Sequence, residues 1–150
     1  MKNTLLCSLL SLYALALAAQ PTENPVQWTF VADVASEGEA ELTFKAAISP
    51  GWYLYAQFIG DEGPIPTSIV FEDAEGMELL GPAVEEGHKV EGMDDLFGIY
   101  ITKFKDEAVF RQRIKRSKEL KAISGYIEFM VCDDEKCLPP SKLEFNFFFE

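Results

Sequence analysis

From Val26 onward, hydrophobic and polar residues alternate with a period of two along most of the chain. Because successive side chains of a β-strand point to opposite faces, this alternation predicts strands with one buried and one solvent-facing side. The clearest alternation covers residues 26–34, 40–48 and 143–149. Weaker patterns predict further strands at residues 52–58, 68–72, 97–104, 108–115 and 121–131.

Turn-forming residues separate the predicted strands, and none of the longer segments has a helical period. The turn signals, rich in Gly, Pro and acidic residues, occupy positions 49–51, 60–66, 81–82 and 106–107. Many short strands joined by turns at this spacing are typical of an immunoglobulin-like antiparallel β-sandwich in the all-β class. Since the sequence shows no internal repeat, linker or low-complexity stretch, we expect a single domain.

The N-terminal segment has the features of a cleaved secretory signal peptide. Lys2 supplies a positive charge, residues 5–17 are mostly apolar, and Ala16-Leu17-Ala18 provides a cleavage site of small residues. We therefore predict a signal peptide at residues 1–18 and a mature domain at residues 19–150. The apolar stretch is short for a membrane span, so an uncleaved anchor is the less favoured alternative. The mature chain is expected to enter an oxidising compartment without inserting into a membrane.

Composition provides the material for a core and argues against one class of partner. Apolar residues make up 48% of the chain and include twelve Phe, and the formal net charge is −12. Such acidity argues against nucleic acid as a partner. Basic residues concentrate between residues 103 and 121, either as the solvated faces of two strands and their turn, which we favour, or as a docking patch for an acidic partner. They are Lys103, Lys105, Arg111, Arg113, Lys115, Arg116, Lys118 and Lys121.

Cys132 and Cys137 are the two cysteines expected in the mature protein, since Cys7 lies within the predicted signal peptide. Four polar residues separate them, so a fully extended strand would hold their Cα atoms roughly 17 Å apart. A disulfide needs a Cα separation of about 4.4–6.8 Å, so the Asp-Asp-Glu-Lys segment must turn back if the sulfurs are to bond. Such a bond is a candidate redox site.

A disulfide between these cysteines would add little to the stability of the domain. Closing a loop of about six residues gives roughly 2 kcal/mol in the chain-entropy model. Burying four Phe side chains contributes roughly 6–12 kcal/mol before conformational entropy is counted. We therefore favour a redox role, and a secreted immunoglobulin-like binding module with a purely structural disulfide is the alternative.

The residues around the cysteines predict a thiol that ionises reluctantly. Asp133, Asp134 and Glu135 place negative charge near both sulfurs, which disfavours the thiolate and raises the thiol pKa. Lys136 offsets this effect only in part. His88, the single histidine, is distant in the sequence and is expected to be an ordinary exposed side chain. Two thiolates and a remote His make a poor ligand set, so we predict no metal or cofactor.

Three motifs in this order resemble the N-terminal periplasmic domain of the bacterial thiol:disulfide interchange protein DsbD. They are Gly-Trp-Tyr-Leu-Tyr at residues 51–55, Asp-Asp-Leu-Phe-Gly at residues 94–98, and Cys132 to Pro140 with its Cys-x-Pro-Pro ending. The resemblance implies an immunoglobulin-like sandwich that carries a redox dithiol. Such a domain accepts electrons that originate at a membrane-embedded transporter and passes them to oxidised periplasmic proteins with thioredoxin-like folds.

The resemblance also implies roles for individual residues. Cys137 would form mixed disulfides with partners, and Cys132 would resolve them. A cap loop would shield the sulfurs with Leu96 or Phe97, although Phe97 as a core aromatic is a competing interpretation. Two tyrosines of the first motif would line the site. The predicted cap loop and site lining are Asp94, Asp95, Leu96, Phe97, Gly98, Tyr53 and Tyr55.

The function implied by the resemblance is thiol–disulfide exchange in the periplasm, as a component of a protein-disulfide reductase system. The electron donor would be a separate membrane-bound or thioredoxin-like protein, because the chain ends at Glu150 without the membrane-spanning and thioredoxin-like segments of the full-length relatives. Oxidised thioredoxin-fold proteins would be the recipients. The spacing between the cysteines is one residue shorter than in the best-known members, which leaves the loop geometry open.

Overall fold

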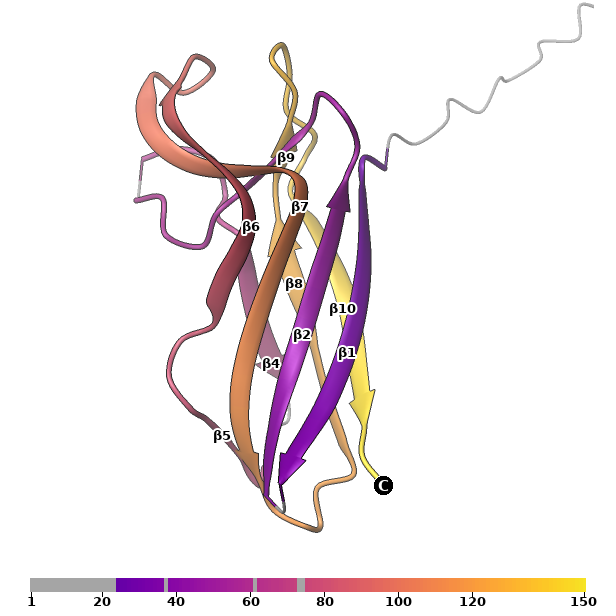
Figure 1. The fold of residues 1–150 in the computed structure, drawn as a ribbon. Coiled ribbons are helices and arrows are strands. Elements are labelled where there is room, and N and C mark those ends of the chain that lie inside the picture. The colour runs from indigo at the N-terminus through magenta and orange to yellow at the C-terminus, as the bar shows by residue number, and fades with distance from the viewer. Residues whose placement is uncertain (1–23, 37, 61, 73–74) are drawn as a thin grey trace, which may run out of the picture.

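A computed structural model describes residues 24–36, 38–60, 62–72 and 75–150, so the predicted signal peptide lies outside the described part of the chain. Within these residues, ten strands form two antiparallel sheets that lie face to face (Figure 1). None of the described segments forms a helix long and apolar enough to cross a membrane.

The larger sheet is organised around one long strand, β7, which is paired along both of its edges. Along one edge lie β2 and then β3, whose outer neighbours are β1 and β9, while β5 and β6 pair along the other. The strands are β1 (Val26–Ser36), β2 (Glu39–Ile48), β3 (Tyr53–Tyr55), β5 (Met77–Leu79), β6 (Val84–Asp94), β7 (Ile99–Arg116) and β9 (Val131–Cys132).

The smaller sheet covers the inner face of the larger one and completes the core. Its order is β10-β8-β4, formed by β4 (Ser68–Glu72), β8 (Ala122–Phe129) and β10 (Ser141–Phe148). Phe44 of β2 is fully buried, and its ring meets the rings of Phe145 and Phe147 edge-on at centroid distances of 4.9 and 5.4 Å. The predicted alternation is confirmed in β2, where Leu42, Phe44 and Ala46 are buried on one face.

The β6–β7 hairpin differs from the prediction. A turn at residues 106–107 is wrong, because β7 continues through them and the register of β6 instead shifts between Gly87 and His88. Asp106 adopts a φ of 62°, and its carboxylate lies 2.8 Å from Nδ1 of His88. Asp106 and Glu107 are therefore the extra residues of a β-bulge in β7. Beyond this bulge, the half of the hairpin that ends in the β6–β7 loop turns away from the direction of the other half (Figure 1).

The alternation of apolar and polar residues does not predict two of the strands, β5 and β6. Most side chains of β5 and β6 are exposed, β5 is only three residues long, and the partly buried face of β6 includes Gly92 and Asp94, so neither strand gives a clear alternation of apolar and polar residues. Their position is fixed by pairing along β7 rather than by burial of one face.

The basic residues of β7 are balanced by acidic neighbours, which favours the interpretation as a solvated strand face over a docking patch. Arg111 lies within 3.3 Å of Glu41 and 3.5 Å of Glu86, and Arg113 lies within 3.3 Å of Glu39. The predicted strands at residues 97–104 and 108–115 form one continuous strand, β7, so no turn separates them.

Candidate functional site

A second, smaller apolar cluster lies on the face of the larger sheet that points away from the core. Leu54 of β3 and Val131 of β9 are paired residues that point into the core between the sheets. Since side chains alternate along a strand, Tyr55 and Cys132 point to the opposite face. There they form the fully buried part of the second cluster with Ile101. Both cysteines therefore lie outside the main core.

Cys132 and Cys137 are joined by a disulfide, with sulfurs 2.00 Å apart and Cα atoms 4.0 Å apart. The intervening segment forms a tight hairpin in which the N–H of Asp133 donates to the carbonyl of Lys136 at 2.9 Å. Oδ1 of Asp133 also accepts hydrogen bonds from the N–H groups of Glu135 and Lys136, at 2.8 and 2.7 Å. The predicted turn of the Asp-Asp-Glu-Lys segment is confirmed.

The two cysteines differ in accessibility. Cys132 sits in β9 opposite Tyr53 and is only 1% exposed, whereas Cys137 follows the hairpin turn and is half-buried. A thiol–disulfide exchange reaction requires direct approach of a thiolate to one sulfur. The residue open to such an approach is Cys137.

The loop between β6 and β7 lies beside the disulfide and contains the second sequence motif. Asp94 organises it: Oδ1 accepts hydrogen bonds from the N–H groups of Leu96 and Phe97 at 3.1 and 3.3 Å. The Asp94 carbonyl accepts a third bond from the N–H of Gly98 at 2.7 Å. Gly98 has a φ of 68°, a conformation that side chains disfavour, and so permits the tight turn.

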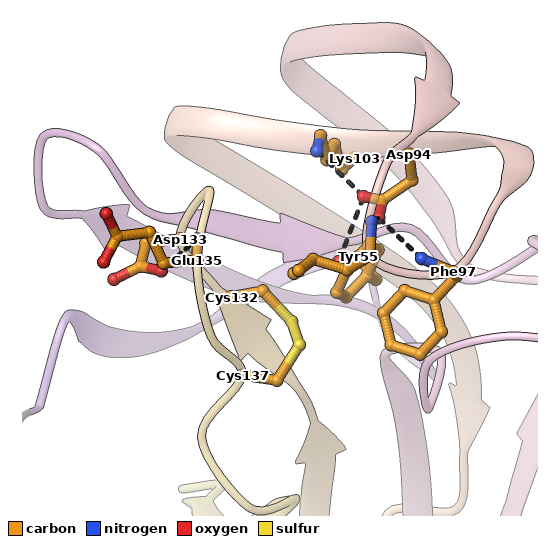
Figure 2. A network of polar contacts seen from close by, with 9 residues as sticks. Tyr55, Asp94, Phe97, Lys103, Cys132, Asp133, Glu135 and Cys137 are labelled. Atoms are coloured by element: carbon orange, nitrogen blue, oxygen red, sulfur yellow. Dashed lines mark hydrogen bonds and ion pairs between the residues drawn. A yellow bond between two sulfur atoms is a disulfide. The ribbon is translucent and has the colours of Figure 1, made fainter.

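Phe97 and Leu96, the two predicted capping residues, occupy different environments. Phe97 packs against the cluster that contains both cysteines, and its ring meets Tyr55 at right angles with centroids 6.0 Å apart (Figure 2). Leu96 is 40% exposed. Asp95 is exposed as well, so Phe97 and Asp94 are the residues of this loop that face the interior of the site.

A buried polar network connects the loop to the strands beneath it. Oδ2 of Asp94 accepts hydrogen bonds from the Tyr55 hydroxyl at 3.2 Å and from Nζ of Lys103 at 2.9 Å (Figure 2). The same ammonium group lies 4.1 Å from the centre of the Tyr53 ring, a cation–π contact. Tyr53 is half-buried and pairs with Cys132, so both predicted tyrosines belong to the site's surroundings.

The environment shifts the acid–base properties of this network. Burial, the charge of Asp94 and the hydrogen bond to it together raise the pKa of Tyr55, which stays a proton donor. Burial also acts to raise the pKa of Asp94, but the hydrogen bond and charge of Lys103 and the two backbone N–H groups outweigh it and hold that pKa below its ordinary value. Asp94 is therefore an ionised carboxylate although it is only 2% exposed.

Acidic residues gather between the loop and the disulfide hairpin. Asp95 from the loop and Asp133 and Asp134 from the hairpin line a shared depression with Asp94, Tyr53 and Lys103. Two backbone N–H groups lower the pKa of Asp133, which keeps it charged. The Asp133 carboxylate is therefore held in place by backbone hydrogen bonds of the hairpin.

Sequence reasoning missed Lys103, which lies at the centre of the network. Nothing in the sequence distinguishes it from the other basic residues between positions 103 and 121. Its distinguishing feature is register: in β7 it lies opposite Tyr55 on one side and Val90 on the other, facing the loop. Among the described residues, no group of three or more His, Cys, Asp or Glu could hold a metal ion.

These features define a β-sandwich domain that carries a shielded disulfide on the outer face of one sheet. Comparison with known families gives the assignment: the profile described as "Thiol:disulfide interchange protein DsbD, N-terminal" matches residues 20–148. The chain belongs to the DsbD N-terminal domain family. No significant match was found among curated proteins.

Solved structures support the same fold at low sequence identity. The N-terminal periplasmic domain of ScsB from Proteus mirabilis aligns with a TM-score of 0.63 and 18% identity over 86% of this chain and 48% of that chain. This chain thus spans about half the length of that structure. The Neisseria meningitidis DsbD N-terminal domain in the reduced form aligns with a TM-score of 0.54 and 19% identity, over 81% of this chain and 85% of that one. The predicted immunoglobulin-like sandwich is confirmed.

Proposed function

We propose that this domain relays reducing equivalents in the periplasm through the Cys132–Cys137 dithiol/disulfide pair. It would take electrons from a membrane electron transporter and deliver them to oxidised thioredoxin-like proteins. Membership of the DsbD N-terminal family implies thiol–disulfide interchange. The observation that carries the proposal is the disulfide itself, which lies outside the core with one half-buried cysteine.

Reduction begins when a donor thiolate attacks Sγ of Cys137. The Cys132–Cys137 bond breaks, Cys132 leaves as a thiolate, and a mixed disulfide links the donor to Cys137. The second thiol of the donor, as its thiolate, then attacks the donor sulfur of the mixed disulfide and releases Cys137. The donor ends as a disulfide and the domain as a dithiol, so two electrons have moved.

Delivery to the recipient repeats these steps in the other direction. The Cys137 thiolate attacks the recipient's disulfide, and Cys132 then attacks Sγ of Cys137 to release the reduced recipient. The choice of Cys137 as the attacking residue is supported by its exposure, because Cys132 is packed beneath the loop. Cys132 needs no access to the partner, since it only attacks its neighbour.

The loop of residues 94–98 serves as a cap in this proposal, with Phe97 as the shielding side chain. Its packing against the cysteine cluster supports this role, and the exposure of Leu96 makes it the second choice. The ionised Asp94 and Asp133 disfavour a free thiolate. A thiol with these neighbours resists stray oxidation and reacts after a partner has displaced the cap.

The end of the β6–β7 hairpin carries exposed apolar side chains. Met93 and Tyr100 lie directly opposite each other in the ladder and are 63% and 69% exposed. With Leu96 they present three large apolar side chains beside the cap.

The location follows from the family and from the N-terminal sequence. The family match begins at residue 20, directly after the predicted signal peptide of residues 1–18. The domain of residues 19–150 would therefore act in the periplasm. Its electron donor would be a separate membrane-bound or thioredoxin-like protein.

Trapping of mixed disulfides tests the proposal. In a Cys132→Ala variant, Cys137 should form a stable mixed disulfide with an oxidised thioredoxin-fold protein, visible as a band that disappears on reduction. The matched Cys137→Ala variant should trap at least about tenfold less, because its remaining thiol is buried. Equal trapping by both variants, or by neither, would favour a secreted binding module with a structural disulfide.

A further inference from the structure

We propose that Lys103 is a positioning residue that holds the cap loop closed over the disulfide. The inference deepens the proposed function, since it concerns control of access to the same site. It depends on two contacts of one ammonium group, to Asp94 and to the Tyr53 ring, and on the hydrogen bonds by which Asp94 holds the loop backbone.

Asp94 uses its two carboxylate oxygens for different purposes. Oδ1 accepts the N–H groups of Leu96 and Phe97 and so fixes the turn that carries the Phe97 ring. Oδ2 accepts Nζ of Lys103 and the Tyr55 hydroxyl, which both come from strands of the sheet below. The loop is thus attached to the sheet through one side chain, and Lys103 is the cationic group in that attachment.

Burial makes the charge of Lys103 necessary. Asp94 is 2% exposed, and an ionised carboxylate removed from water is stable only when it is paired and hydrogen-bonded. Tyr55 and the backbone N–H groups supply neutral donors. Without the ammonium group, the carboxylate would either take up a proton or move toward water, and each response weakens its bonds to the loop.

The position of Lys103 is itself linked to the disulfide strand. Its Nζ lies over the ring of Tyr53, and Tyr53 pairs with Cys132 across β3 and β9. Lys103 therefore connects β3, the strand that pairs with the cysteine-bearing β9, with the loop that covers the disulfide. A partner that displaces Tyr53 would remove one of the two contacts that hold the ammonium in place.

Hydrogen exchange of the Leu96 and Phe97 amides in the oxidised protein tests this role. Both N–H groups donate to Asp94, so their protection factors report directly on the closed loop. In Lys103→Met, which keeps the length of the side chain and loses its charge, the two factors should fall at least about tenfold at pH 7, the loss expected for a charge-assisted hydrogen bond. Lys103→Arg should stay within about threefold of the wild type.

Lys89 provides a matched control on the same hairpin. It also pairs with a carboxylate, Glu85 at 3.1 Å, and also lies over an aromatic ring, that of Phe104 at 5.6 Å, but it does not contact the loop. Lys89→Met should leave the protection of Leu96 and Phe97 unchanged. If Lys103→Met does not fold, Lys103→Gln, which retains one neutral donor, should give a smaller loss of the same sign.

The pH dependence distinguishes a charge effect from a loss of packing. With Lys103 present, protection should be constant between about pH 5 and 8, because Asp94 remains ionised. In Lys103→Met, protection should decline further as the pH falls through this range, since a buried carboxylate without a cation binds a proton more readily. The titratable groups facing Asp94 in the wild type are Lys103, Tyr55, Tyr53, Asp95, Asp133 and Asp134.

Wild-type protection in Lys103→Met or Lys103→Gln, or an equal loss in Lys89→Met, would overturn the assignment. A loss in Lys103→Met without any pH dependence would do so as well, because it would indicate packing alone. The measurement uses the oxidised protein and no redox partner. Its failure therefore leaves the exchange reaction untouched, and failure of the exchange reaction leaves this result untouched.

Discussion

The two apolar clusters of the domain lie on opposite faces of β3 and β9 and differ in kind. The core between the sheets contains many buried apolar side chains, with Phe44 in contact with rings from the facing sheet. Among the described residues, the second cluster fully buries only Tyr55, Ile101 and Cys132, next to the ionised Asp94.

The difference separates stability from reactivity. Under the proposed function, the bond that is made and broken lies on the outer face of a stable sheet rather than inside the core. In the proposed reaction, opening the loop of residues 94–98 would expose few apolar side chains, because the cluster beneath it is small. The core between the sheets does not need to change during that step.

The largest expected effect comes from removing an aromatic ring of the core. Phe44→Ala should lower the free energy of unfolding by about 3–5 kcal/mol, because it leaves a cavity among packed rings. Denaturant unfolding of the oxidised protein measures this loss. The redox equilibrium of the folded fraction should stay as in the wild type, and a shift in that equilibrium would contradict the separation of the two clusters.

The same substitution in the second cluster should affect reactivity more than stability. Phe97→Ala should speed alkylation of the reduced cysteines about tenfold while it lowers the free energy of unfolding by less than about 2 kcal/mol, because the ring is only partly buried. Iodoacetamide labelling followed by mass spectrometry measures the rate. Phe148→Ala, at an exposed ring on β10, is the control and should change neither quantity.

Unchanged alkylation in Phe97→Ala would assign the shielding role to another side chain. Leu96→Ala is the direct comparison, since Leu96 is the second predicted capping residue. A larger rate increase in Leu96→Ala than in Phe97→Ala would show that the exposed residue of the loop covers the sulfurs in solution.

The smallest expected effect is a dependence of stability on alkaline pH. Burial and Asp94 raise the pKa of Tyr55 above its ordinary value of 10.0, so the folded state holds the phenolic proton more tightly than the unfolded state does. The resulting stabilisation is fully present below about pH 10 and is lost as the pH rises above that value. Tyr55→Phe should remove this decline and cost less than about 1.5 kcal/mol at pH 7.

Tyr100→Phe, at an exposed hydroxyl, is the control for that experiment and should retain the decline. Denaturant unfolding between pH 7 and 11 provides the measurement. A decline of the same size in wild type and Tyr55→Phe would assign it to other groups. At acidic pH, Asp94 should have the corresponding effect. Because its pKa is lowered in the folded state, its contribution to the free energy of unfolding is present above about pH 3.8 and is lost as the pH falls below that value.

Much of the fold and part of the site could be predicted from the sequence. Alternation located the strands of the core because their inner faces are buried, as in β2 and β10. The same signal fails for β6, because most of its side chains are exposed and its partly buried face includes Gly92 and Asp94 rather than a run of apolar residues. The Asp-Glu pair at residues 106–107 has the composition of a turn, and only the pairing of β6 with β7 shows that it is a bulge.

At the site, spacing and composition identified the cysteines and their acidic neighbours, and the family resemblance pointed to the loop of residues 94–98. Neither could select Lys103 from a run of basic residues, because its role depends on which strand lies beside β7 at that position. The burial of Cys132 and the partial exposure of Cys137 likewise depend on the face of β9 that Cys132 occupies and on the hairpin that places Cys137 beside it, neither of which the sequence encodes locally.

The most direct measurement of the central claim is the reduction potential of the Cys132–Cys137 disulfide in the folded domain, by equilibrium with glutathione and with a thioredoxin. Reversible reduction with an intact fold, at a potential between about −180 and −270 mV where thioredoxin-fold proteins operate, is the predicted result. A potential below about −300 mV, or reduction that occurs only together with unfolding, would contradict an electron-relay role and indicate a structural bond.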